Sequence, residues 1–197
     1  MTHATDQSAL DQVFIAAHTA NKFTDRAVDD ATLRALYELC KWGPTSMNCQ
    51  PMRLVFVRSA EAKAKLKEAL SPGNLDKTLA APVTAIVATD TQFYEHLPTQ
   101  FSPMPTAREM FSGNAALSSE TAARNSSLQG AYLMIAARLL GLAAGPMSGF
   151  NPGKVNEQFF PDGRVQANFL VNLGYADPAG NRPRGPRLAF DDVAKIL

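Results

Sequence analysis

The nine residues Gly43-Pro44-Thr45-Ser46-Met47-Asn48-Cys49-Gln50-Pro51 carry more information than any other stretch of the chain. They lie between a run with helical spacing of apolar residues, 30–42, and a β-prone run, 53–58. Two hydroxyls and two primary amides in a proline-stiffened loop can form hydrogen bonds without carrying charge. This chemistry suits a flat, neutral heterocycle with carbonyl and imide groups, such as a flavin ring, better than a phosphate or a metal. The alternative is an ordinary connection, in which Gly43 ends a helix and Pro44 stops it.

The run 44–51 resembles the Pro-Ser-x-x-Asn-x-Gln-Pro loop of the FMN-dependent nitroreductase family, and it follows the first helices as in that family. Further matches follow in the same order along nearly the whole chain. They are most similar to the branch that contains the malonic semialdehyde reductase of pyrimidine breakdown. The resemblance implies an α+β nitroreductase-like fold, with a central mixed or antiparallel sheet packed by helices. It also implies an intertwined homodimer with FMN at two interface sites, where the loop contributes Pro44, Thr45, Ser46, Asn48 and Gln50.

Two segments resemble the phosphate-binding positions of the family. The hexapeptide that begins at His18 takes the place of a basic Arg-Ser-x-Arg-x-Phe-like segment, so Thr19 and Asn21 are expected contacts. Asn21 stands where the family usually has Arg or Lys, which weakens a phosphate clamp on this side. Arg182 and Arg184 fall at the C-terminal pair of cations of the family, and guanidiniums hold phosphate by forked hydrogen bonds. Without the resemblance, both segments read as solvated polar surface.

Two further segments are expected at the edge of the flavin ring. Asn74 and Lys77 have the spacing of an Asn and a Lys that reach the pyrimidine edge and the nicotinamide nucleotide in the family. The run Pro146-Met147-Ser148-Gly149 resembles the turn that gives a backbone hydrogen bond to the flavin N5. Ser148 stands where many members carry Glu, which implies a more neutral pocket. Read alone, Asn74 is a turn residue and Lys77 is solvated, while the glycine segment is either a functional loop or a plain turn.

Composition bounds the class of protein. A chain of 197 residues, 46% apolar and 19% charged, favours a single globular domain over 1–197. A net charge of +1 supplies no overall field for nucleic acid or anionic lipid. The longest apolar tract, 131–145, contains Arg138 and is too short to span a membrane. The amino terminus does not read as a secretory signal, so the cytoplasm is the expected compartment.

Cysteines and histidines show no metal-ligand spacing, and no metal site is expected. Cys40 falls on the apolar stripe of its helix and reads as a core residue. Cys49 could be a nucleophile, but nothing in the sequence places a His or a cation beside it, so packing is the preferred interpretation.

The pattern predicts strands near 53–58, 83–89 and 165–174, interleaved with helices. The helices are expected at 9–20, 30–42, 59–70 and 115–142, followed by a glycine-rich loop. Between Asp90 and Asn114 the periodicity is lost and prolines and aromatics accumulate, which is typical of a functional or mobile segment. This segment resembles the excursion that covers the substrate side of the flavin in the family.

The resemblance implies an FMN-dependent NAD(P)H oxidoreductase that works by a ping-pong scheme. NADH or NADPH reduces the flavin at N5 and leaves, and a small acceptor then takes the electrons, so the cofactor rather than a side chain carries the reaction. The preferred acceptor is malonic semialdehyde, reduced to 3-hydroxypropionate, with nitroaromatics and quinones as the alternative within one mechanism. A flavin-binding module without turnover, or a structural dimer that binds nothing, is the alternative of another class.

Overall fold

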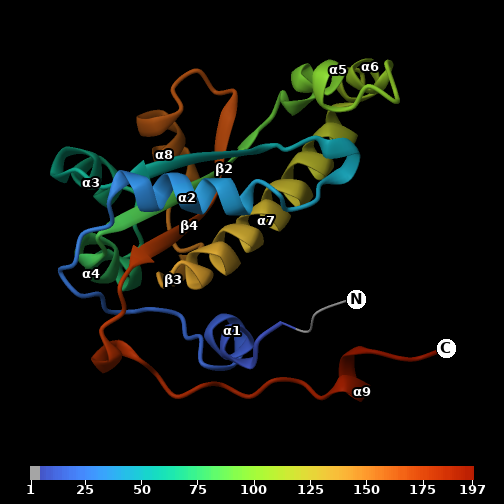
Figure 1. Ribbon diagram of the computed structural model, residues 1–197. Coiled ribbons are helices and arrows are strands. Elements are labelled where there is room, and N and C mark those ends of the chain that lie inside the picture. The colour runs from blue at the N-terminus through green and yellow to red at the C-terminus, as the bar shows by residue number, and fades with distance from the viewer. Residues whose placement is uncertain (1–4) are drawn as a thin grey trace.

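The computed structural model describes residues 5–197, and these form a sheet with helices on both faces (Figure 1). The strands are β1 (Met52–Val57), β2 (Val83–Asp90), β3 (Ala143–Met147) and β4 (Val165–Gly174). Their order is β1-β2-β4-β3, and each neighbouring pair is antiparallel. The expectation of an α+β fold with an antiparallel sheet packed by helices is confirmed.

Helices α2 (Asp30–Cys40) and α7 (Ala115–Leu139) cover one face of the sheet (Figure 1). Each begins at a side-chain cap, because Asp29 accepts from the amide of Thr32 and Asn114 accepts from the amide of Leu117. The helices pack against each other and against the sheet, with Leu36 of α2 and Leu133 of α7 in one core with Val87 of β2 and Val171 of β4. In the second half of α7, α2 and the sheet bury Leu133, Ala136 and Ala137. Leu128, Tyr132 and Leu139, on other sides of the same half, remain exposed, so the expected burial on most sides is only partly met within the chain.

The opposite face is covered by α3 (Ala60–Lys67) and α8 (Pro152–Phe159), while α4 (Pro72–Ala80) leads into β2. Beyond the far end of β2, the segment after Asp90 folds into η3 (Phe93–His96), α5 (Leu97–Gln100) and α6 (Ala107–Ser112). These short helices enclose a small core of their own, in which the ring centroids of Phe93 and Phe111 lie 5.0 Å apart. The expected aperiodic excursion is therefore ordered by aromatic packing rather than by regular periodicity.

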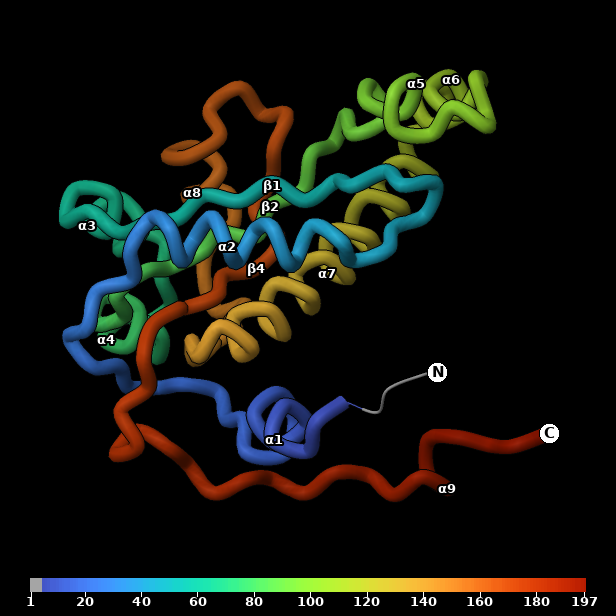
Figure 2. Tube along the Cα trace, in the orientation of Figure 1, coloured from blue at the N-terminus to red at the C-terminus, as the bar shows by residue number. Residues whose placement is uncertain are grey.

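The first helix is shorter than predicted. α1 (Gln7–Leu10) continues as a π-helical turn, η1 (Asp11–Ile15), and the backbone leaves the helix well before residue 20. After β4 the chain forms η4 (Pro178–Gly180), runs extended, and ends with the single turn α9 (Phe190–Val193). Figure 2 shows this tail running beside the α1 segment, apart from the body of the sheet. Among the described residues, no helix is both long and apolar enough to span a bilayer.

Strand β3 corrects the prediction of a helix running into a loop at residues 143–147. The segment pairs with β4 from Ala143 to Met147 and forms one edge of the sheet. Its small side chains let another segment lie close alongside, because the amide of Ala20 donates to the carbonyl of Ala144 at 3.2 Å. A Cβ on Gly145 would sit 2.6 Å from the carbonyl oxygen of Ala20, so only glycine allows this approach. Residues 18–21 are thereby held along the outer edge of β3.

Candidate functional site

A cavity of about 510 Å³ lies where the first helix, the end of α7 and the C-terminal tail meet. Its lining contains Phe14, Ala17, His18, Thr19, Asn21, Arg138, Arg182, Pro183, Arg184, Gly185 and Arg187. The structure thus brings the sequence-predicted residues His18, Thr19 and Asn21 together with Arg182 and Arg184. Four guanidiniums and no carboxylate line the cavity, a donor set that suits a phosphate.

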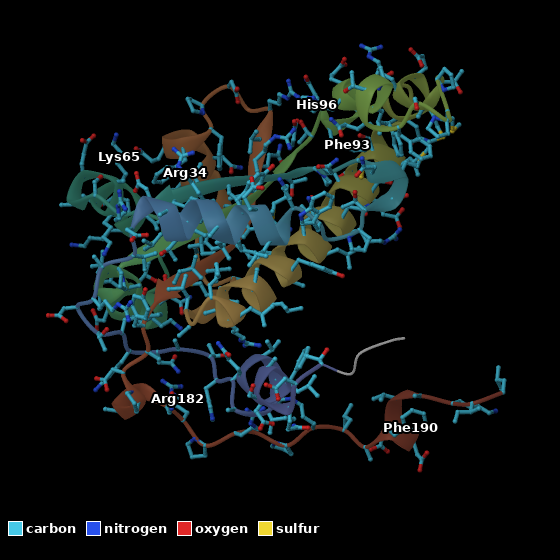
Figure 3. All side chains as sticks on the ribbon, viewed as in Figure 1. Arg34, Lys65, Phe93, His96, Arg182 and Phe190 are labelled. Atoms are coloured by element: carbon cyan, nitrogen blue, oxygen red, sulfur yellow. The ribbon has the colours of Figure 1, made fainter. Side chains whose placement is uncertain are left out.

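Arg138 is a cation of this cavity that the sequence analysis did not assign to it. It lies in the last turn of α7, and its Nη1 donates to the carbonyl of Val13 at 2.9 Å. Burial, with a smaller contribution from the charge of Arg184, lowers the pKa of Arg138. Arg184 in turn donates from Nη2 to the carbonyls of Ile15 and Ala17, at 2.5 and 2.7 Å. Figure 3 labels Arg182 on the same tail. Arg138 therefore adds a cation to the same cavity in which Asn21 contributes only an amide.

A second group of predicted residues gathers at the turn after β3. The Asn74 side chain donates from Nδ2 to the carbonyl of Gly149 at 2.9 Å, and the amide of Ser71 donates to the same oxygen at 3.1 Å. A Cβ on Gly149 would lie 2.4 Å from Asn74 Nδ2, so a glycine keeps this contact possible. Ser148 is exposed at the turn, and Lys77 lies on α4 one turn after Asn74. Asn74 therefore fixes the position of the turn at Gly149 through this hydrogen bond.

Strand β3 connects this turn to the cationic cavity. The amide of Ala20 is hydrogen-bonded to the carbonyl of Ala144 in β3. Ser148 lies four residues after Ala144, a distance of about 13 Å in extended chain. The side chain of Pro146 is half-buried and that of Met147 accepts a hydrogen bond from the Thr78 hydroxyl at 3.4 Å between oxygen and sulfur. The edge of β3 thus carries no charged side chain, and it runs from the cationic cavity at one end to the turn that contacts Asn74 at the other.

The loop 44–50 is the third group, and it holds an unusual backbone. Met47, Asn48 and Gln50 have φ values of 51°, 49° and 41°, in the left-handed region that few residues other than glycine adopt. Side chains inside the loop stabilise it, because Thr45 Oγ1 accepts from the Gln50 amide at 3.2 Å and Asn48 Oδ1 accepts from Gln50 Nε2 at 2.9 Å.

Neighbouring elements hold the same loop from outside. The amide of Ser46 donates to Asn125 Oδ1 of α7 at 2.8 Å, and Asn48 Nδ2 donates to the carbonyl of Gln100 at 3.1 Å. Pro44, Ser46 and Asn48 are exposed. The loop therefore exposes the hydroxyl of Ser46 and the amide of Asn48, neither of which carries a charge, at the protein surface.

The loop does not meet the other two groups within one chain. Met52, at its end, is aligned through Thr89 with Gln166 of β4, whereas Met147 pairs with Leu170. Three inter-strand spacings and four residues along β4 therefore separate them, about 20 Å in all. The tube in Figure 2 shows the loop at one end of β1, on the side of the sheet away from β3.

Cys49, considered as a nucleophile, is buried in the small aromatic core. Burial raises the pKa of its thiol to about 11, with a smaller opposing effect from its hydrogen bond to Thr45. A thiol of this pKa is protonated near neutral pH, so Cys49 packs the loop against the excursion. Cys40 is also buried, and burial raises its pKa to about 11.

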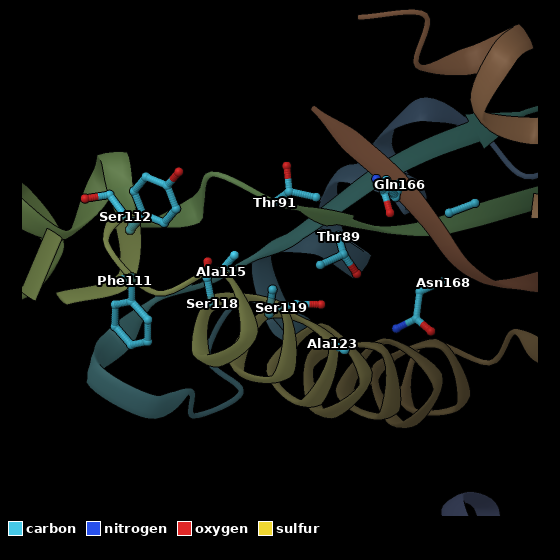
Figure 4. A pocket seen from close by; sticks show the side chains of 13 residues that line it. Thr89, Thr91, Phe111, Ser112, Ala115, Ser118, Ser119, Ala123, Gln166 and Asn168 are labelled. Atoms are coloured by element: carbon cyan, nitrogen blue, oxygen red, sulfur yellow. The ribbon is translucent and has the colours of Figure 1, made fainter. Parts of the chain in front are cut away.

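A further cavity, of about 380 Å³, lies between α7 and the start of β4 (Figure 4). Its lining carries no charge and includes Thr89, Ser119, Gln166 and Asn168, with Phe111 at one end. The hydroxyl of Ser118 is buried beside it without a hydrogen-bond partner in the described part of the chain. No sequence signal predicted this cavity, because its walls come from segments far apart in the chain.

An α+β protein with a cationic cavity that continues into a neutral strand edge fits the class that binds phosphorylated ring cofactors. The chain belongs to the Nitroreductase family, whose family model matches residues 16–175. A relative from Burkholderia lata, provisionally named NADH dehydrogenase/NAD(P)H nitroreductase, is 60% identical over 196 residues, which is 100% of each chain. The family expected from the loop 44–51 is confirmed, and with it an oxidoreductase; the semialdehyde branch remains a prediction.

Solved structures give the same fold. A Bacillus subtilis protein described as a nitroreductase has a TM-score of 0.87 at 20% identity, covering 98% of this chain and 100% of its own. A protein from Exiguobacterium sibiricum, described as a nitroreductase in complex with FMN, has a TM-score of 0.84 at 21% identity, covering 100% of this chain and 99% of its own. At these identities the likeness establishes the fold.

Proposed function

We propose that this protein is a homodimeric FMN-dependent NAD(P)H oxidoreductase with a small organic acceptor. The observation that carries the proposal is the cavity where four arginines meet residues 18–21 beside the edge of β3. The FMN complex of the Exiguobacterium sibiricum protein and the NAD(P)H named for the Burkholderia lata relative support the cofactor and the reductant.

The side chains of the cationic cavity suit the phosphate of FMN. The phosphate would take the guanidiniums of Arg138, Arg182 and Arg184 with the side chains of His18 and Thr19, at the cavity that no acidic residue lines. Asn21 lies in the same lining and would contribute an amide rather than a charge. The net positive charge of the cavity favours a phosphate over an uncharged sugar or nucleoside.

The ring would lie along the turn after β3. No acceptor among residues 5–197 pairs with the amide of Gly149, which leaves this N–H as a donor for the ring. Asn74 would meet the edge of the ring from α4, and Lys77 would place a positive charge near it. When bound, FMN supplies the hydride chemistry, and the residues of this chain bind, orient and tune it. Pro146, Met147 and Ser148 complete the proposed wall.

The position of loop 44–50 supports the proposed homodimer. Pro44, Thr45, Ser46, Asn48 and Gln50 precede Met52, which lies about 20 Å from Met147, just before the turn at Gly149, in the same chain by strand spacing. A second copy that brings this loop to the turn would complete a ring site with neutral donors and acceptors. Each copy would then contribute to two sites, so that the sites form at the interface.

Exposed apolar side chains support a partner copy. On the tail, Leu188, Phe190 and Ile196 are 74%, 59% and 86% exposed, and on the α2 side Trp42 is 77% exposed. The outer edge of β1 is also unpaired within the described chain. Large apolar groups and a free strand edge together mark surfaces that another chain covers. A second copy of the chain would cover the exposed apolar side chains and pair with or cover the free edge of β1, and in a symmetric dimer each copy would do this for the other.

The acceptor is proposed in two forms that share one scheme. The sequence resemblance favours malonic semialdehyde, reduced to 3-hydroxypropionate. The name of the Burkholderia lata relative favours a nitro compound, with quinones as a related class. The uncharged Ser148 at the turn is compatible with either acceptor.

A spectrum of the purified protein tests the proposal. We expect bound flavin absorbance, bleaching by NADH or NADPH without acceptor, and recovery of the colour when acceptor is added without oxygen. Recovery with malonic semialdehyde but not a nitroarene would select the first acceptor, and the reverse the second. Flavin that binds but is not bleached would instead identify a binding module without turnover, and absence of flavin binding would contradict the proposal.

A further inference from the structure

The strained loop 44–50 is attached at its end to a buried charge network. Asp90, at the end of β2, is 1% exposed. Its carboxylate accepts hydrogen bonds from Arg53 Nη2 at 2.5 Å, from Arg164 Nε and Nη2 at 2.8 Å each, and from the Gln92 amide at 2.9 Å. A buried carboxylate with this many donors fixes the groups around it.

Arg53 connects this network to the loop. While its Nη2 bonds Asp90, its Nη1 donates to the carbonyl of Gln50 at 3.0 Å and to that of Met52 at 2.9 Å. Gln50 is the last of the three left-handed residues, and it precedes Pro51, which favours extended backbone at that position. Such conformations persist only where the surroundings hold them. The hydrogen bond from Arg53 Nη1 holds the carbonyl of Gln50 in place.

Arg164 provides an internal comparison. It shares the Asp90 carboxylate with Arg53 and forms two hydrogen bonds to it, more than Arg53 does. Its side chain makes no hydrogen bond to any atom of the loop within the described chain. Loss of either arginine would therefore weaken the network, but only loss of Arg53 would release the loop.

We propose that Asp90 and Arg53 are positioning residues for the cofactor site: Asp90 fixes the Arg53 guanidinium, which locks the carbonyl of Gln50 and preorganises loop 44–50 before a ring binds. The inference rests on the proposed function for its purpose, since the loop is the part offered to the ring held by a second copy. A loop that is already ordered in the free protein loses no further conformational entropy when the ring binds, and this raises the affinity.

The experiment compares Arg53→Gln with Arg164→Gln, each of which removes one guanidinium from Asp90. The first readout is amide hydrogen exchange of residues 46–50 in the flavin-free protein, and the second is the Kd for FMN from flavin fluorescence. We expect Arg53→Gln to speed exchange in the loop and to weaken FMN binding about tenfold, the effect of losing one charged hydrogen bond. Arg164→Gln should leave both values close to those of the unmodified protein.

Asp90→Asn provides a second variant of unchanged shape, and it should resemble Arg53→Gln in both readouts. Equal loop exchange in Arg53→Gln and Arg164→Gln would overturn the inference, as would unchanged exchange in all three variants. If the unmodified protein binds no FMN, the proposed function fails, while the exchange comparison still decides whether Asp90 and Arg53 hold the loop.

Discussion

Replacing Arg184 with Ala removes one of the four cations of the cationic cavity and the attachment of the tail to the first helix. The guanidinium donates to the carbonyls of Ile15 and Ala17 at 2.5 and 2.7 Å, and these residues lead directly into His18 and Thr19. The change therefore removes a proposed phosphate donor and loosens the segment that carries two other proposed donors.

The size of the effect follows from the exposure of the side chain. A hydrogen bond to a charged group contributes about 1.5–3 kcal/mol, and because Arg184 is exposed we expect the lower end. A loss of about 1.5 kcal/mol corresponds to FMN binding that is about tenfold weaker. Added salt should weaken FMN binding less in the variant than in the unmodified protein, since one charge no longer contributes.

Titration of flavin fluorescence with the flavin-free protein measures this effect. Riboflavin lacks the phosphate, so its affinity should be nearly the same in the variant and the unmodified protein. Arg34→Ala, which removes a cation that lines a different cavity on α2, is the matched control and should leave both affinities unchanged. Equal weakening of FMN and riboflavin binding by Arg184→Ala, or no weakening, would refute a phosphate role for the tail.

Three further changes give expected outcomes. Gly149→Ala should weaken FMN binding about two- to tenfold, because its Cβ would lie 2.4 Å from Asn74 Nδ2 and displace that side chain from the turn; unchanged affinity would contradict this. Ser118→Ala should stabilise the protein by about 1 kcal/mol in thermal unfolding, because it removes a buried hydroxyl without a partner and favours the helix; a lower Tm would contradict this. Burial raises the pKa of Asp90, but hydrogen bonds from Arg164 and Gln92 and the charge of Arg53 outweigh it, so the pKa is lowered. The carboxylate therefore stabilises the fold above its unfolded pKa, and this stability is lost as the pH falls below about 4. The Tm of Asp90→Asn should fall less over that range, and equal acid sensitivity would refute the role of Asp90.

The sequence identified the segments with local signals. The loop 44–51 was recognisable because prolines, amides and hydroxyls are concentrated in it, and its place between a helix and a strand is confirmed. β2 and β4 were predicted because continuous β-prone runs mark buried strands. β3 was missed because Ala143 to Met147 has low strand propensity, and its pairing depends on β4 and on the close approach of Ala20 to Gly145.

The site was predictable only where contacts are local in sequence. Arg138 was visible as the one cation in the apolar tract 131–145, but nothing in its neighbourhood shows that it meets Arg184 and His18. Asp90 lies 37 residues from Arg53 and 74 residues from Arg164, so their network appears only when β1, β2 and β4 pair. Three-dimensional pairing, not residue type, places these charges.

A mixed dimer tests the central claim most directly, namely that one chain provides the phosphate cavity and its partner provides the loop. Asn48→Ala would weaken the loop and Arg184→Ala the cavity, and two affinity tags would isolate the dimer that holds one chain of each. We predict one FMN bound per mixed dimer with the affinity of the unmodified protein, because one of its two sites combines an intact cavity with an intact loop, while the other combines the two altered parts. If no FMN binds at that affinity, each site lies within a single chain, and the account is contradicted.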